Sequence, residues 1–278
     1  MKAHRSNRLP AALAAAALAT FALAPAGLVA QEKVPAPQAA PAGAPMNTFS
    51  ADQKSEIQRI IKDYLVANPE VFLEVQQALE AKMEQAQAEK LKLALAAQAD
   101  ALYRDPDAPV AGDPKGDVTI VEFFDYNCGY CKRGFQDLAR FMKDDPKVRV
   151  VLRELPILSK GSEEASRVAL AARMQGKYWE FHAAMLAQKG QADMASALKV
   201  AEKAGLDMAK LKTDLAAPGI DAQIKKVRDL AQTLGINGTP HFLVGDRSIP
   251  GAPQDLFDQL KADVAAIRKS GCGTTTAC

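Results

Sequence analysis

The chain has 278 residues and nearly balanced charge, with 35 Lys and Arg against 33 Asp and Glu and a formal net charge of +2. Basic and acidic residues are interspersed, which argues against nucleic acid or an anionic membrane as a partner. There are only four cysteines, so their positions are informative.

Residues 1–30 resemble a secretory signal peptide: a basic segment ending at Arg8 is followed by an uncharged, Ala-rich run from Leu9 to Ala30. A transmembrane helix is the alternative, but Pro25 interrupts the run. We expect cleavage near Ala30 and a soluble protein exported to the periplasm. Because disulfides persist outside the cytosol, export favours redox chemistry or structural bridging for the cysteines over metal binding.

Residues 31–47 are rich in Pro and Ala without apolar periodicity, which predicts a disordered linker. Residues 48–104 are predicted to form an N-terminal helical region. Its first helix should begin at Ser50, whose side chain caps the helix while Gln53 reaches back to the cap.

A second, longer helix should start with Asn68 as N-cap and Pro69 at its first position and run to about Leu102, a length of about fifty ångströms. An apolar stripe follows it, interrupted at Lys90 and made of Phe72, Val75, Leu79, Met83 and Ala86. Two interpretations stay open: copies of the chain associate through the stripe to form a homo-oligomer, or the helix folds back on its own catalytic domain.

From Gly116 the pattern changes to alternating strands and helices. The runs "DVTIVEFFDY" and "VRVVLRELPI" are strand-like, and a helix over residues 132–144 lies between them. Residues 162–235 have a helical pattern. "TPHFLVGDRSIPG" then predicts two short strands, and "PQDLFDQLKADVAAIRKSG" a closing helix. The fold class is therefore α/β with a helical insertion.

Cys128 and Cys131 form a CxxC pair directly after the first of these strands. With Asn127 as N-cap, Cys128 falls in the first helical turn, where free N–H groups and the helix dipole favour a thiolate. Residues three apart share a helix face, so the two sulfurs can bond. A purely structural disulfide is a weak alternative, because so short a loop stabilises little.

Two other CxxC chemistries fit poorly. Haem attachment needs a histidine where Lys132 stands. Zinc would need a second cysteine pair, and Cys272 and Cys278 are too widely spaced for one. We expect no metal and no cofactor other than a redox-active disulfide between Cys128 and Cys131.

The succession of strand, "CGYC", helix, strand, helical insertion, "GTPHFLV" and closing helix over residues 105–270 resembles the DsbA-like thiol-disulfide oxidoreductases of the thioredoxin superfamily. The resemblance implies a thioredoxin fold in which Cys128 is the exposed, attacking cysteine and Cys131 the buried, resolving one. It also implies a cis peptide bond between Thr239 and Pro240, facing the cysteines. The Thr239 backbone would then be free to pair with an extended substrate peptide.

Glu122 lies within the apolar strand that precedes the cysteine pair, and strand alternation predicts that its carboxylate is buried. The functional interpretation, which the family matches, is a proton acceptor that helps Cys131 ionise when it resolves a mixed disulfide. The alternative is an acid at the strand edge, solvated or paired with Lys132 or Arg149.

Three further predictions concern single residues. His182 is predicted to be a packing histidine rather than a ligand. Tyr130 is expected to be an exposed groove residue that tunes the cysteine pair, with surface filling as the alternative, and His241 is expected near the substrate groove.

The tail over residues 271–278 carries Cys272 and Cys278, which are expected to form a structural disulfide. A redox relay to Cys128 or an intermolecular link is the alternative.

These observations predict thiol-disulfide exchange on exported proteins, with a membrane redox partner that reoxidises or reduces the pair. Isomerase activity is favoured because "CGYC" is similar to the active-site motif of the DsbC isomerases and the N-terminal helices resemble those of ScsC-type proteins. The interruption at Lys90 counts against an oligomeric isomerase, so a DsbA-like oxidase is the alternative. A second alternative is a redox-responsive chaperone or adaptor.

Overall fold

The computed structural model describes residues 49–271. The predicted signal peptide (1–30), linker (31–47) and Cys272–Cys278 disulfide lie outside the described residues. The chain divides into two compact units between Ala67 and Asn68.

The described part of the first unit is helix α1, Ala51–Ala67. The Gln53 N–H donates to Ser50 Oγ at 3.2 Å, and the Ser50 N–H donates to Gln53 Oε1 at 2.9 Å. These two bonds confirm the predicted cap, because each residue satisfies an N–H group of the other at the start of the helix.

The second unit begins with α2, Glu70–Ala97, and the short α3, Ala99–Tyr103. The prediction of one helix to Leu102 was wrong, because Gln98 leaves helical geometry at φ −105° and ψ 13°. Beyond this break, Leu102 and Tyr103 pack in an apolar core on one face of the sheet. The Tyr103 hydroxyl also donates to the Gly245 carbonyl at 2.8 Å. The break therefore allows α3 to pack on the sheet, a contact that the local sequence does not predict.

This packing also bears on the predicted boundary between residues 104 and 105. Leu95 at the end of α2 and Leu102 in α3 share a core with Val121 and Phe123 of the sheet. The two helices consequently belong to the same unit as the sheet, and the chain divides at residue 67 instead.

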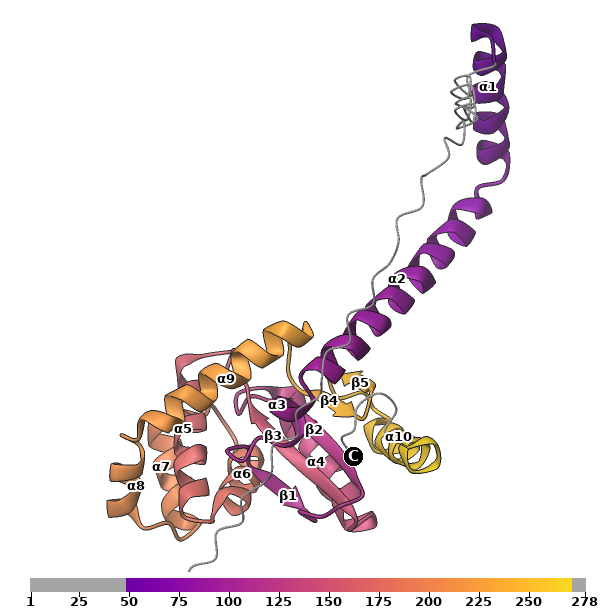
Figure 1. The fold of residues 1–278 in the computed structure, drawn as a ribbon. Helices are drawn as coiled ribbons and strands as arrows, with labels where there is room; N and C mark the ends of the chain where they lie inside the picture. The colour runs from indigo at the N-terminus through magenta and orange to yellow at the C-terminus, as the bar shows by residue number, and fades with distance from the viewer. Residues whose placement is uncertain (1–48, 272–278) are drawn as a thin grey trace, which may run out of the picture. The chain divides into compact units, whose positions relative to one another are not determined.

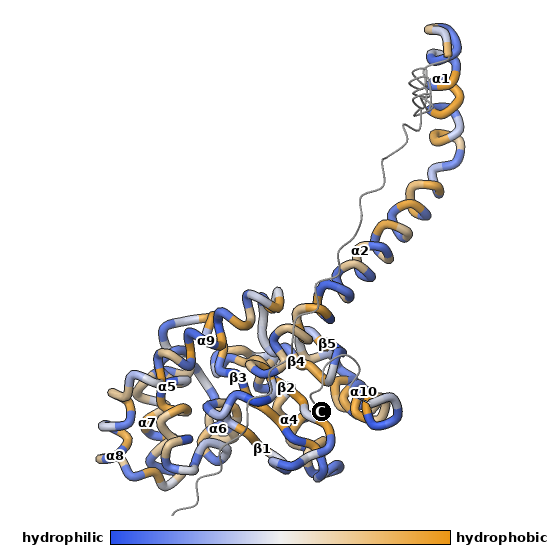
Figure 2. The backbone as a smooth tube through the Cα atoms, viewed as in Figure 1, coloured by the Kyte–Doolittle hydropathy of each residue, from blue (hydrophilic) through white to orange (hydrophobic). Residues whose placement is uncertain are grey.

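The apolar stripe of α2 is exposed over most of the helix. Figure 2 shows apolar (orange) and polar (blue) segments alternating along α2. The exposed fractions of four of its residues lie between 56 and 63%: Phe72, Val75, Leu79 and Met83. Leu95 is the one buried residue that α2 contributes. The stripe therefore does not fold back on the catalytic domain, and only the C-terminal end of α2 packs there.

The five-stranded sheet has the order β1-β3-β2-β4-β5 (Figure 1). β2 and β3 are parallel, and the other neighbouring pairs are antiparallel. β1 was not predicted; three residues pairing with β3 are too few to show a strand period. The strands are β1 Val110–Gly112, β2 Val118–Phe124, β3 Val148–Glu154, β4 His241–Val244 and β5 Arg247–Pro250.

Helices cover both faces of this sheet (Figure 1). α4, Gly129–Asp144, and α10, Leu256–Ser270, pack on one face. α9, Pro218–Leu234, packs on the other with α3. The insertion between β3 and β4 begins with α5 Lys160–Met174, α6 Tyr178–Ala187, α7 Met194–Lys203 and α8 Met208–Asp214. The predicted α/β class and helical insertion are confirmed. No helix within residues 49–271 is both long and apolar enough to cross a membrane.

Candidate active site

Cys128 is itself the N-cap of α4, so the helix begins one residue later than predicted. Its φ and ψ are −79° and 116°, and its sulfur accepts the Cys131 N–H at 3.3 Å. Asn127, the expected cap, instead donates its side-chain N–H groups to Ser159, Ser162 and the Ala192 carbonyl. The sulfur therefore takes the place of the usual capping oxygen and receives a free N–H of the helix start.

The Thr239–Pro240 peptide bond is cis, as the resemblance implied. The Cys128 thiol donates to the Thr239 carbonyl oxygen at 3.1 Å. The start of α4 and the loop before β4 are thus in direct contact, although 111 residues separate them in the sequence.

Both active-site cysteines are free thiols in this structure. Cys131 is fully buried, as expected, but Cys128 exposes only 6% of its surface. The prediction of an exposed attacking cysteine is corrected: Cys128 is buried, and its sulfur contacts the Thr239 carbonyl.

The two thiols have opposite acidities. The pKa of Cys128 falls to about 6, chiefly because the Cys131 thiol hydrogen-bonds to its sulfur, with the Thr239 side chain and backbone N–H groups adding to this and burial opposing it. Burial raises the pKa of Cys131 above its usual range, and so do its bond to Cys128 and the nearby Glu122 carboxylate. At pH 7 Cys128 is therefore mainly a thiolate, the nucleophilic form, and Cys131 a thiol.

Glu122 lies in β2 and is completely buried. Neither carboxylate oxygen has a hydrogen-bond partner among the described residues. Lys132 donates to the carbonyls of Gln188 and Gly190, and Arg149 to that of Tyr103, so the alternative of a solvated or ion-paired acid is wrong. Burial, followed by the charges of Cys128 and Glu154, raises the pKa of Glu122 to about 8. This carboxyl can take up or release a proton near neutral pH.

A second buried acid, Glu154, was missed by the sequence analysis. It ends β3 and is paired in register with Phe124 of β2. Three hydroxyl groups donate to it, from Tyr178 at 2.6 Å, Ser166 at 2.7 Å and Tyr126 at 3.2 Å. Burial raises the pKa of Glu154 to about 8 despite these bonds. Strand alternation places it in the core, but its donors come from a loop and two helices that no local pattern connects.

His182 is a packing histidine, as predicted. It is fully buried, stacks on Tyr178 and Trp179, and its Nδ1 lies 3.2 Å from the Tyr126 hydroxyl. Burial lowers its pKa to about 3, so the ring is neutral at physiological pH.

Tyr130 and His241 lie in different surroundings. Tyr130 is 61% exposed on α4, with the Arg133 guanidinium 5.0 Å from its ring centre. His241 is half-buried in β4, and its Nε2 lies 2.8 Å from Ser248 Oγ. Burial lowers the pKa of His241 to about 4.

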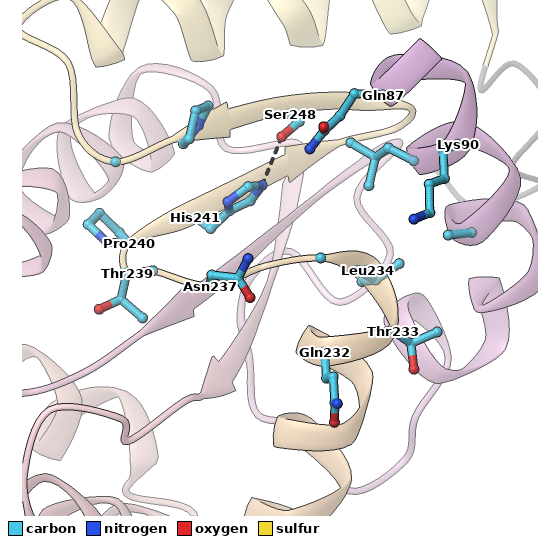
Figure 3. Close-up of a pocket in the computed structure, with 16 residues that line it drawn as sticks. Gln87, Lys90, Gln232, Thr233, Leu234, Asn237, Thr239, Pro240, His241 and Ser248 are labelled. Atoms are coloured by element: carbon cyan, nitrogen blue, oxygen red, sulfur yellow. Dashed lines mark hydrogen bonds between the residues drawn. The ribbon is translucent and has the colours of Figure 1, made fainter. Parts of the chain in front are cut away.

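A groove of about 600 Å³ adjoins the cis-proline loop (Figure 3). Thr239, Pro240 and His241 line it, as does the face of α2 that carries Lys90. Tyr130 is not among its lining residues. The structure thus brings three of the four predicted substrate-binding residues together and adds a wall from α2.

Comparison with family models divides the chain into two matched regions. A model described as the DSBA-like thioredoxin domain matches residues 119–264, which is more than half of the chain. A second, described as the N-terminal domain of the copper resistance protein ScsC, matches residues 53–86, within α1 and α2.

Solved structures show the same thioredoxin-like fold. A thioredoxin-like oxidoreductase from Silicibacter pomeroyi is 48% identical, with a TM-score of 0.59, covering 62% of this chain and 98% of that protein. A linker-deletion mutant of ScsC from Proteus mirabilis is 28% identical, with a TM-score of 0.62, covering 81% of this chain and 99% of that protein.

The curated relatives include much longer proteins. The Na(+)/H(+) antiporter NhaA 1 of Salinispora arenicola is 31% identical over 173 residues, which make up 61% of this chain and 26% of the antiporter. The chain thus spans about a quarter of the length of the first curated relatives it matches.

Proposed function

Because the chain belongs to the DSBA-like thioredoxin domain family, we propose that it exchanges disulfides with exported proteins through Cys128 and Cys131. One observation carries the proposal: the Cys128 sulfur accepts the Cys131 N–H and contacts the Thr239 carbonyl beside cis-Pro240. An acidic thiol at a helix start, paired with a buried thiol of high pKa, is suited to nucleophilic attack on a disulfide.

In the reductive direction, the Cys128 thiolate attacks one sulfur of a substrate disulfide. The substrate S–S bond breaks, one substrate sulfur leaves as a thiolate, and the other is bonded to Cys128. Cys131 then loses its proton to Glu122 and attacks Cys128, releasing the second substrate thiolate. The substrate gains two electrons, and the Cys128–Cys131 disulfide holds the oxidising equivalents. Oxidation of a substrate dithiol is the reverse sequence.

For the direction of exchange, we favour isomerisation. The "CGYC" motif, the ScsC-like match over residues 53–86 and the exposed stripe of α2 support it. Association of copies through that stripe would raise the local concentration of Cys128 sites around one misfolded client. We also propose that the protein is periplasmic and that a membrane redox partner keeps Cys128 and Cys131 reduced.

The test is to give the protein a client with scrambled disulfides and, separately, the same client fully reduced. An isomerase restores the scrambled client when glutathione keeps Cys128 reduced. An oxidase acts faster on the reduced client and does little for the scrambled one. Retention of activity by Cys128→Ala would favour the chaperone or adaptor alternative, since no exchange can then occur.

A further inference from the structure

The groove beside the cis-proline loop adjoins the proposed site of disulfide exchange. Thr239, whose carbonyl accepts the Cys128 thiol, lines one end of it. The α2 helix forms the opposite wall, and Figure 3 shows Lys90 extending from that helix toward the loop that carries Asn237. Cys128 does not line the groove itself but contacts it through Thr239.

The groove has a distinct charge. Among residues 49–271, Lys90 is the one Lys or Arg that lines it, and no carboxylate does. Lys90 forms no ion pair with any side chain in residues 49–271. An unpaired ammonium group facing a groove without acidic side chains attracts a negative group.

We propose that this groove binds the polypeptide segment flanking the reacting cysteine of a client, and that Lys90 selects clients with an acidic side chain in that segment. The inference rests on the proposed exchange function and names its substrate class. Lys90, which interrupts the apolar stripe, lies on the part of α2 that lines the groove.

The other lining groups suit a polypeptide. Leu91, Ala94 and Pro240 provide apolar surface, while Gln87 and Asn237 provide amides that can donate to and accept from a peptide backbone. A client chain that pairs with the loop at Thr239 and continues past it would enter this space.

The experiment measures attack by Cys128 on symmetrical peptide disulfides. The full chain carries Cys131→Ala, Cys272→Ser and Cys278→Ser, so that Cys128 is its one remaining thiol. The Cys128 thiolate attacks either of two equivalent sulfurs, one peptide leaves as a thiolate, and the other stays bonded to Cys128. In a peptide series, a single Glu is moved one position at a time away from the cysteine, with Gln in matched peptides.

We expect one or two Glu positions to react up to about five-fold faster than the Gln peptides, the scale of an exposed ion pair. This advantage should vanish in about 1 M salt, where screening acts within about 3 Å. Lys90→Gln should abolish it, and Lys90→Glu should transfer the preference to peptides with Lys at the same position. Lys82→Gln, the same change elsewhere on α2 and outside the groove, should leave it intact.

Two results would overturn the inference. If Lys90→Gln and Lys82→Gln behave alike with every peptide while Cys128 reacts normally, the groove does not select acidic clients, and the proposed exchange function stands. If Cys128 reacts with none of the peptide disulfides, the exchange function fails, and the inference fails with it.

Discussion

The sulfur of Cys128 lies 3.1 Å from the carbonyl oxygen of Thr239, the residue before cis-Pro240. This contact joins the nucleophile at the start of α4 to the loop that would hold a substrate backbone. Cys128 is 6% exposed. The proposed peptide recognition places the backbone of a client cysteine alongside Thr239.

The acidity of Cys128 should depend on Cys131. We predict that the thiolate absorbance of the reduced protein titrates with a midpoint near pH 6, the pKa of Cys128. In Cys131→Ala the midpoint should rise, because the thiol that hydrogen-bonds to the Cys128 sulfur is gone while the backbone N–H remains. An unchanged midpoint would show that the backbone and the Thr239 side chain suffice.

Glu122 should control the second step of exchange. Glu122→Gln is expected to slow the attack of Cys131 on a preformed Cys128 mixed disulfide, because an amide cannot accept the Cys131 proton. General base catalysis contributes about 10²- to 10⁴-fold, so a loss of at least about tenfold is expected. Stopped-flow release of a labelled peptide measures this rate, and an equal rate in both proteins would remove Glu122 from the mechanism.

Glu122 should also make stability depend on pH. Its pKa is raised from 4.5 to about 8 on folding, so its contribution is favourable below pH 4.5 and is lost as pH rises toward 8. Relative to Glu122→Gln, the wild type should lose up to about 3 kcal/mol between pH 4.5 and pH 7, at about 1.36 kcal/mol per unit. Urea unfolding of both reduced proteins at several pH values measures the difference; a constant difference would contradict a buried, unpaired carboxyl.

The hydroxyl network on Glu154 should stabilise the fold. Tyr178→Phe removes the 2.6 Å donor to this buried carboxyl and should lower the free energy of unfolding by about 1 to 3 kcal/mol. Tyr130→Phe is the matched control, since this exposed hydroxyl lies outside the network, and should change stability by less than about 0.5 kcal/mol. Equal effects of the two substitutions would show that the network adds nothing.

Local sequence patterns predicted much of the site. The spacing of Cys128 and Cys131 after an apolar strand predicted a reactive pair, and strand alternation correctly predicted that Glu122 is buried. The cis bond at Pro240 came from family resemblance alone, because an X-Pro bond does not reveal its isomer in the sequence.

Features that depend on distant contacts were not predictable. The break at Gln98 follows from packing of α3 on the sheet. Cys128 caps α4 in place of the predicted Asn127, because the Asn127 amide donates to Ser159 and Ser162, more than thirty residues away. In the sequence, Lys90 only interrupts an apolar stripe. Its position in the groove depends on the packing of α2 beside the cis-proline loop, which no local pattern predicts.

The most direct test of the account is equilibration of the Cys128–Cys131 pair with glutathione, in a variant carrying Cys272→Ser and Cys278→Ser. Mass spectrometry after alkylation counts the free thiols. The account predicts one two-electron transition between about −120 and −270 mV, the range of DsbA and thioredoxin, with isomerase or reductase action at its reducing end. A pair that never forms the disulfide over this range would contradict thiol-disulfide exchange through Cys128 and Cys131.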